Sequence, residues 1–432
     1  MDPMAHTEKT DQAFRRQGPR PLELHLMQTL TTWLSLAAMW PHSKNGWLSS
    51  NPEVATKLVQ LQAKGASANP DFTAALEKAA VVRARAFLSG IKAYRHHPAR
   101  RTLNEAPVIW HKGTTLLRDY NPGTPDAPVM LVIPSLINRF DILDLDRGHS
   151  FLRALTERGF RPLVVDWGRP GDEEQHFGLT DYVGKRLIPV LEFIQNAGIG
   201  IPDTTKKTYA GRVTHPQFRI HLAGYCMGGL LALALAALRP DQIRSLTLLA
   251  TPWDFHKPDA AIGAQFLALA VQMEPYLKAL GHLPVDVIQS LFATFQPMQV
   301  MGKFTSFAAL DPLSIEARQF VLLEDWLNDG VPLPAPAARE CFIDWYGENR
   351  TAKTEWHIEG AIVDPRKLAM PAYVVAPGKD RIVPPESAKP LAKLLPHASL
   401  HEPMAGHIGI IASAKAPQQV WLPLFHWLDQ HK

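Results

Sequence analysis

The feature of this sequence that most restricts its fold is a series of short apolar runs separated by helix-like segments. The runs lie at 129–133, 162–166, 218–223, 245–249 and 372–376. Between them, apolar residues recur at helical spacing near 148–158, 180–196 and 227–238. Buried strands that alternate with helices form a mostly parallel sheet with helices on both faces. We therefore expect an α/β fold.

The segments around these runs predict the domain organisation. Residues 1–20 are polar and are expected to form a disordered tail, whereas 21–105 have helical spacing and no strand pattern. Two short runs around His111-Lys-Gly113 predict a hairpin at the start of the core, which we assign to 106–254 and 366–432. Residues 255–365 are rich in aromatic residues and punctuated by proline, and they predict a helical cap inserted between two strands.

Composition excludes several classes of protein. The net charge is only +4, and no long Lys/Arg block is present, so nucleic acid is not an expected partner. Two cysteines, Cys226 and Cys341, argue against a secreted disulfide scaffold and favour the cytoplasm. The N-terminus has no apolar signal core. The most apolar early stretch, roughly 30–40, is shorter than the about 20 residues that span a bilayer. We expect it to be a buried helix, with an interfacial helix as the alternative.

The strongest chemical signal is Gly224-Tyr-Cys226-Met-Gly228, which follows an apolar run and opens an Ala/Leu-rich helix. This is the nucleophile-elbow pattern G-x-S-x-G of α/β hydrolases with sulfur in place of oxygen. The elbow places the nucleophile at a helix N-terminus, where free N–H groups and the helix dipole favour a thiolate. The backbone N–H of Met227 is then one predicted oxyanion donor. The alternative is a buried structural cysteine in a glycine-rich turn.

A triad on this fold needs an acid and then a histidine further along the chain. Asp380 follows the run at 372–376, and His407 lies in a small-residue loop before a C-terminal helix. We predict that they are the acid and the base. Asp254 is the alternative acid, and the remaining candidates, expected to be structural, are His221, Asp364 and His401.

A second oxyanion donor is expected in the loop after the first core run. The backbone N–H of Leu136 or Ile137 is the candidate, whereas Ser135 lacks the glycine pattern of an elbow. We expect no metal and no cofactor. A thioester on Cys226 is close in energy to a carrier thioester, and this similarity favours acyl transfer over hydrolysis.

Several ordered motifs together resemble polyhydroxyalkanoate synthases of short or intermediate length, members of the α/β-hydrolase superfamily. Gly224-Tyr-Cys-Met-Gly-Gly229 resembles the cysteine-containing box of that family. The other similar segments are Pro134-Ser-Leu-Ile-Asn-Arg139, Ile142-Leu-Asp-Leu145, Val165-Asp-Trp-Gly-Arg-Pro170, Leu249-Ala-Thr-Pro-Trp-Asp254, Glu324-Asp-Trp-Leu-Asn-Asp329, Gly378-Lys-Asp-Arg-Ile-Val-Pro384 and Gly406-His-Ile408. The resemblance departs at Arg381, where the family often has histidine, and in the first loop, where the family usually has an aromatic residue after two prolines and this chain has Ile133-Pro-Ser-Leu136.

The resemblance implies an acyltransferase that polymerises (R)-3-hydroxyacyl-CoA into polyester and releases CoA. It implies roles for Cys226 as nucleophile, His407 as general base, and Asp380 in orienting or activating the attacking hydroxyl. The implied partners are the CoA thioester, the growing polyester, a second copy bound through the cap, and a second synthase subunit or granule proteins. The expected location is the cytoplasm, at the polyester granule surface, without a transmembrane segment. Alternatives are a thioesterase or polyester depolymerase of the same fold, and a non-catalytic granule-associated or acyl-CoA-binding homologue.

Overall fold

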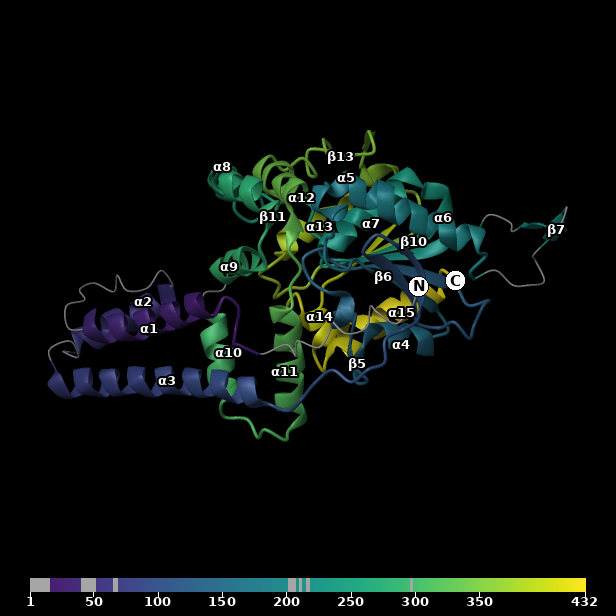
Figure 1. The fold of residues 1–432 in the computed structure, drawn as a ribbon. Helices are drawn as coiled ribbons and strands as arrows, with labels where there is room; N and C mark the ends of the chain where they lie inside the picture. Colours follow the sequence, from purple (N-terminus) through teal and green to yellow (C-terminus); the bar gives the residue numbers. More distant parts are fainter. Residues whose placement is uncertain are drawn as a thin grey trace, which may run out of the picture. The chain divides into compact units, whose positions relative to one another are not determined.

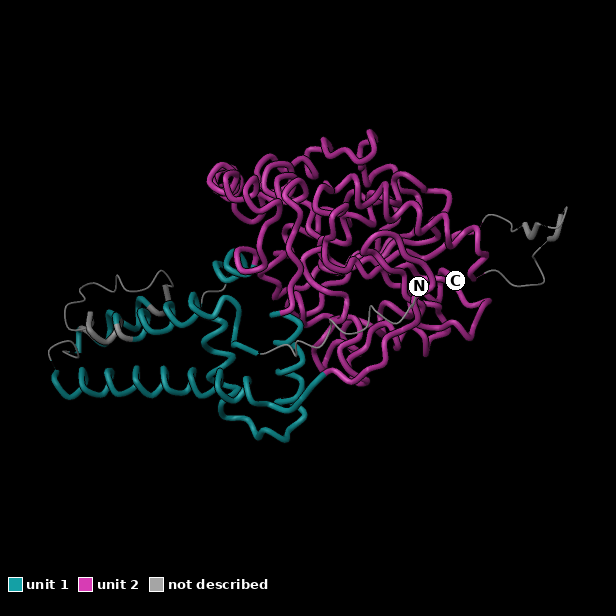
Figure 2. Tube along the Cα trace, viewed as in Figure 1, with its two compact units in different colours: residues 1–100, 289–328 teal, residues 101–288, 329–432 magenta. Residues whose placement is uncertain are grey.

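The structure is a computed structural model that describes residues 16–39, 52–64, 69–200, 207–209, 212–214, 218–295 and 298–432. Two compact units make up the chain (Figure 2). Unit 1 contains residues 1–100 and 289–328, and unit 2 contains residues 101–288 and 329–432.

Unit 2 is built on a mixed sheet of eight strands in the part of the chain that the structure describes. In spatial order these are β1 (Val108–Lys112), β2 (Thr115–Asp119), β6 (Arg161–Asp166), β3 (Val129–Ile133), β9 (Ile220–Tyr225), β10 (Ile243–Leu249), β15 (Ala372–Val375) and β16 (Ala398–His401). The strands from β6 to β16 are parallel, whereas β1 pairs with β2, and β2 with β6, in antiparallel fashion. Every predicted apolar run is a strand of this sheet, and the predicted hairpin is confirmed.

Helices cover both faces of the sheet (Figure 1). One face carries α4 (Phe151–Glu157) and α15 (Leu422–Asp429), and the other carries α6 (Ile188–Asn196) and α7 (Met227–Leu238). Helix α7 packs on β9, β10 and β3 and is buried over its first ten residues. All residues of β3 and β9 are buried, as expected for strands that lie between two helical layers.

Unit 2 also contains several shorter elements. Among them are β4 (Asp144–Asp146), β5 (His149–Ser150), α5 (Leu179–Tyr182), the π-helix η5 (Val183–Leu187), β7 (Lys207–Tyr209), β8 (Arg212–Thr214), α13 (Pro385–Leu394), α14 (Gly409–Ala412) and the π-helix η10 (Pro417–Trp421).

The segment between β10 and β15 is mainly helical. Its helices are α8 (Ala261–Leu280), α9 (Val285–Phe295), α10 (Gln299–Phe307), α11 (Ile315–Asn328), α12 (Ala335–Glu340) and the π-helix η8 (Cys341–Gly347). Its strands form two small hairpins, β11 (His282–Leu283) with β12 (Leu333–Pro334) and β13 (His357–Ile358) with β14 (Ala361–Ile362). The predicted cap segment, 255–365, is divided between the units, because 289–328 belong to unit 1.

Unit 1 combines residues 289–328 of this segment with the N-terminal helices α1 (Leu22–Met39), α2 (Pro52–Ala63) and α3 (Pro70–His96). Helix α10 packs closely on α3, and the ring of Tyr94 meets that of Phe304 edge-on, with centroids 5.7 Å apart. A Cβ added to Gly90 would lie 2.0 Å from the carbonyl oxygen of Phe304. The two helices therefore approach so closely that only glycine fits at this position.

One prediction about the N-terminal region is wrong where the structure describes it. Residues 16–20 are not a disordered tail, because the buried guanidinium of Arg16 pairs with Asp325 at 2.6 Å and donates to the carbonyls of His97 and Ala99. Residues 1–15 lie outside the described residues. In the predicted apolar stretch, Leu30 is 40% exposed and Trp33 packs against the apolar core of unit 1, whereas the side chains of 36–40 lie outside the described residues. Across the described helices, none combines the length and apolar character needed to cross a membrane.

Candidate active site

Cys226 occupies a sharp turn between β9 and α7. Its φ is 56° and its ψ is −127°, a conformation that non-glycine residues rarely adopt and that marks functional turns. Its backbone N–H donates to the carbonyl of Leu249 on β10 at 2.8 Å. The predicted strand–turn–helix context is therefore present, and it leaves the side chain of Cys226 half-buried at the start of α7.

The elbow depends on a glycine that follows the cysteine. A Cβ on Gly228 would lie 2.2 Å from the carbonyl oxygen of Ile133 and 2.5 Å from that of Pro134. Both obstructing atoms are backbone atoms of β3 and of the loop that follows it. The missing side chain thus allows this loop, with its predicted oxyanion donors, to lie against the first turn of α7.

Asp380 and His407 meet as the sequence predicts. The carboxylate Oδ2 of Asp380 lies 2.7 Å from Nδ1 of His407, and the Asp380 side chain is fully buried. The other carboxylate oxygen accepts the N–H groups of Ile382 and Val383, each at 2.9 Å. Asp380 is therefore fixed on both oxygens, and it holds the histidine ring in one orientation.

The loops that contain this acid and this base are joined by their backbones. Three hydrogen bonds of 2.9–3.0 Å connect them, from the N–H groups of Ala376, Gly378 and Lys379 to the carbonyls of His401, Pro403 and Ala405. This ladder continues the β15–β16 pairing beyond the strands. The separation between Asp380 and His407 is consequently set by the sheet rather than by the flexibility of either loop.

The electrostatics of His407 link it to the cysteine. Burial alone would lower the pKa of His407, but the nearby charges of Asp380 and Cys226 and the hydrogen bond to Asp380 raise it to about 10. The raised pKa means that this site favours the imidazolium form of His407 more than water does. Tyr225 stacks on its ring at a centroid distance of 5.3 Å and donates its hydroxyl to the His407 carbonyl at 3.2 Å.

Tyr346 is a residue of this site that sequence reasoning did not single out. It lies on η8, and burial, together with the proximity of the Cys226 and Cys341 thiol groups, raises its pKa. Its ring stacks on Phe266 at 4.1 Å and meets Phe255 edge-on at 4.7 Å. The only hint in the sequence was an aromatic-rich segment, because π-helical geometry has no simple periodic pattern.

The loop after β3 contains the predicted second oxyanion donors. The indole N–H of Trp167 donates to the Pro134 carbonyl at 3.1 Å, and the Ile137 carbonyl accepts the N–H of Val331 at 2.9 Å. The N–H of Ile137 points to Ser135 Oγ only at the long distance of 3.5 Å. Leu136 is buried in the same loop, and Met227 begins α7, so its N–H lies in the first turn, where intrahelical partners are missing.

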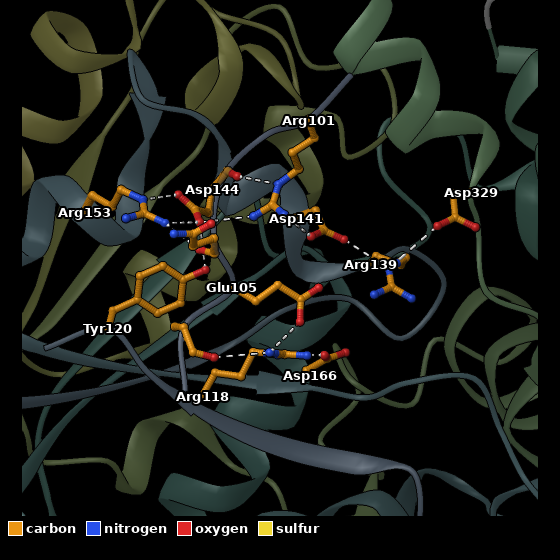
Figure 3. Close-up of polar contacts among 12 residues, drawn as sticks. Arg101, Glu105, Arg118, Tyr120, Arg139, Asp141, Asp144, Arg153, Asp166 and Asp329 are labelled. Carbon is orange, nitrogen blue, oxygen red and sulfur yellow. Dashed lines mark hydrogen bonds and ion pairs between the residues drawn. The ribbon is translucent and has the colours of Figure 1, made fainter. Parts of the chain in front are cut away.

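A network of ion pairs fixes the chain that follows this loop (Figure 3). The fully buried carboxylate of Asp144 receives Arg101 at 3.1 Å, Arg153 at 2.8 Å and the Tyr120 hydroxyl at 3.0 Å. Asp141 pairs with Arg139, the last residue of the loop motif, at 3.0 Å. The segments 134–139 and 142–145, both quoted above for the resemblance, are therefore linked by one network of ion pairs.

The alternative candidates have other partners. Asp254 accepts the side-chain amide of Asn349 at 2.8 Å and the N–H of His256 at 3.2 Å. The buried His221 bonds to Ser245 at 2.8 Å, His401 to the Gln419 carbonyl at 2.6 Å, and Asp364 to Arg366 at 2.8 Å. Each of these side chains thus has a hydrogen-bond partner other than Asp380, His407 or Cys226, although Nε2 of the buried His221 has none among the described residues.

The chain is similar in sequence to curated poly(3-hydroxyalkanoate) polymerase subunits. The chain is 28% identical over 339 residues to the Poly(3-hydroxyalkanoate) polymerase subunit PhaC of Haloferax mediterranei, covering 76% of this chain and 64% of that protein. It is 27% identical over 336 residues to the subunit of the same name from Synechocystis sp., covering 75% and 84%. These relatives confirm the resemblance to polyhydroxyalkanoate synthases, although the chain spans less than two thirds of the Haloferax protein.

Among solved structures, a putative non-heme bromoperoxidase BpoC from Mycobacterium tuberculosis H37Rv is similar, with 15% identity and a TM-score of 0.44, covering 77% of this chain and all of that one. The family model described as "alpha/beta hydrolase fold" matches residues 128–414, which is well over half of the chain. Together with the mostly parallel sheet and the elbow, this match shows that the chain belongs to the α/β-hydrolase fold family.

Proposed function

We propose that this chain is an acyltransferase that polymerises (R)-3-hydroxyacyl-CoA into polyhydroxyalkanoate through a thioester on Cys226. The observation that supports it most is a cysteine at the strained elbow, together with a buried His407 that is held by Asp380 and whose pKa is raised. Curated relatives named as poly(3-hydroxyalkanoate) polymerase subunits give the substrate class. We expect no metal and no cofactor, with the CoA thioester as substrate.

Acylation begins with attack by the Cys226 sulfur on the carbonyl carbon of the acyl-CoA. The oxyanion that forms would be stabilised by the N–H of Met227 and by that of Leu136 or Ile137. The bond between this carbon and the CoA sulfur then breaks, and His407 supplies the proton that the departing thiolate takes up. The acyl group is left on Cys226 beside a neutral imidazole.

In the transfer step, His407 accepts a proton instead of donating one. The neutral His407 accepts the proton of the 3-hydroxyl group of a second acyl unit, whose oxygen attacks the carbonyl of the Cys226 thioester. The bond from this carbon to the cysteine sulfur breaks, which restores the thiolate beside the imidazolium. Asp380 stabilises the charged ring and, by resemblance, helps to orient or activate the hydroxyl.

Incubation of the full chain with 3-hydroxybutyryl-CoA tests the proposal, when both free CoA and the acyl product are followed. Polymer with CoA release supports it. Free 3-hydroxybutyrate would identify a thioesterase or depolymerase, in which water takes the acyl group. Absence of CoA release would identify a binding homologue.

Assembly and location follow only from the resemblance. We propose a homodimer formed through the helical insertion, association with a second synthase subunit or granule proteins, and residence in the cytoplasm at the granule surface. Light scattering of the purified chain, with and without acyl-CoA, tests the dimer, and a monomer in both samples would contradict it.

A further inference from the structure

The loop that contains Asp380 also presents two cations to solvent. Lys379 and Arg381 are exposed, whereas Asp380 between them is buried and bonded to His407. Ile382, the next residue, packs with Cys226 against one small apolar cluster formed by Ala376, Val383 and Ala388. Within four consecutive residues, Asp380 is therefore buried against His407 and Ile382 packs on the cluster that Cys226 also contacts, while the two cations between and beside them are exposed to solvent.

The backbone beneath these cations is rigid. Lys379 donates its N–H to the Ala405 carbonyl at 3.0 Å, and the Asp380 carboxylate accepts the N–H groups of Ile382 and Val383. Pro384 and Pro385 then open α13. Because the backbone on both sides of Asp380 is fixed, the long side chains of Lys379 and Arg381 extend from anchored positions.

The charges of these two side chains are not neutralised within the protein. Across the described residues, no carboxylate lies within ion-pairing distance of either cation. Glu402, in the loop that leads to His407, pairs with Lys389, and the carboxylate of Asp380 is hydrogen-bonded to His407. The exposed acid nearest in sequence is Glu386 in the first turn of α13. Two free cations beside the site are suited to an anionic substrate that approaches from solvent.

We propose that Lys379 and Arg381 form a subsite for the phosphate groups of the CoA thioester. The inference rests on the proposed function, because the reacting thioester of CoA is joined to its phosphates by a flexible pantetheine arm. An Arg guanidinium binds phosphate oxygens in a bidentate fork, and a Lys ammonium binds them as a point charge. The subsite would hold the carrier at the rim while its acyl group reaches Cys226.

Equilibrium binding of two probes, CoA and pantetheine, tests this subsite apart from turnover. Pantetheine keeps the thiol arm and lacks every phosphate. We expect Lys379→Ala/Arg381→Ala to raise the Kd for CoA about tenfold and the Kd for pantetheine less than twofold, as for loss of charged contacts at a rim. Lys393→Ala, which removes an exposed cation from the last turn of α13, is the matched control and should change neither value.

The outcomes separate this inference from the proposed function. An unchanged Kd for CoA in the double variant, or equal weakening of both probes, overturns the subsite even if the enzyme still polymerises 3-hydroxybutyryl-CoA. A selective loss of CoA binding supports the subsite even if the acyl product proves to be free acid. Arg381→Lys, which keeps the charge but not the fork, should show an intermediate Kd for CoA.

Discussion

Gly228 shows how one residue sets the geometry of the site. In Gly228→Ala the new methyl group would meet two backbone carbonyls at 2.2 Å and 2.5 Å, so the loop after β3 must shift. We expect the free energy of unfolding to fall by about 2 kcal/mol, within the range for overpacking, and CoA release to fall with it. Urea unfolding and the CoA assay measure both effects.

Gly302 on α10 offers the control for that substitution. A Cβ there meets nothing within 4 Å, and alanine favours a helix over glycine by about 1 kcal/mol. Gly302→Ala should therefore leave stability equal or higher. If Gly228→Ala proved as harmless as Gly302→Ala, the close approach between the elbow and the β3 loop would not constrain the site.

Asp380 should determine both activity and its dependence on pH. Asp380→Asn keeps the shape but removes the charge that holds the imidazolium, and such a change in a triad costs about 10⁴-fold in rate. Asp254→Asn should retain activity, because Asp254 bonds to Asn349 and His256 instead of the histidine. Inactivity of Asp254→Asn together with normal activity of Asp380→Asn would reverse this choice of acid.

Asp380→Asn should also change how the free energy of unfolding depends on pH. The folded pKa of His407, about 10, is above its ordinary value of 6.5, so its contribution to stability is complete below pH 6.5 and disappears as the pH rises through 10. Asp380→Asn removes the main charge that raises this pKa. The loss of unfolding free energy between pH 6.5 and 10 should then be smaller in Asp380→Asn than in the unmodified chain. Urea titrations at several pH values with equal slopes for both proteins would contradict the assignment.

Among the elements, ion pairs to the buried carboxylate of Asp144 hold the chain between β3 and α4. Asp144→Asn would leave Arg101 and Arg153 without their shared anion (Figure 3); because both arginines are partly exposed, we expect a loss of about 2 kcal/mol, below the roughly 3–5 kcal/mol of a fully buried pair. Thermal or urea unfolding measures this loss, and Asp126→Asn at an exposed acid is the control. A loss of less than 0.5 kcal/mol, roughly the effect of an ordinary surface substitution, would contradict a stabilising role for the network.

Sequence patterns predict elements well where one periodicity dominates. The buried runs of β3, β6, β9, β10 and β15 are visible because parallel strands between helices consist of apolar residues. The network around Asp144 is not visible, since Arg101 and Arg153 reach it from separate segments. Tyr346 was missed for a similar reason, because its position near Cys226 depends on the π-helical turn of η8 and on the packing of α8.

At the scale of the whole molecule, the order of elements was more predictable than their grouping. The fixed chain order of elbow, acid and base predicts Cys226, Asp380 and His407 for these positions, and the structure brings Asp380 and His407 together at 2.7 Å. The assignment of 289–328 to unit 1 depends on contacts of α10 with α1 and α3, which are more than 200 residues earlier in the chain. Such packing between distant segments leaves no periodic trace in a single sequence.

The central claim is that the acyl group passes through the sulfur of Cys226. The most direct measurement is intact mass spectrometry of the full chain after brief mixing with 3-hydroxybutyryl-CoA, followed by location of the adduct in digested peptides. We predict a hydroxybutyryl adduct, or a short oligomer, on the peptide that contains Cys226, and neither adduct nor CoA release in Cys226→Ala. CoA release that continues in Cys226→Ala, or an adduct on another residue, would contradict the account.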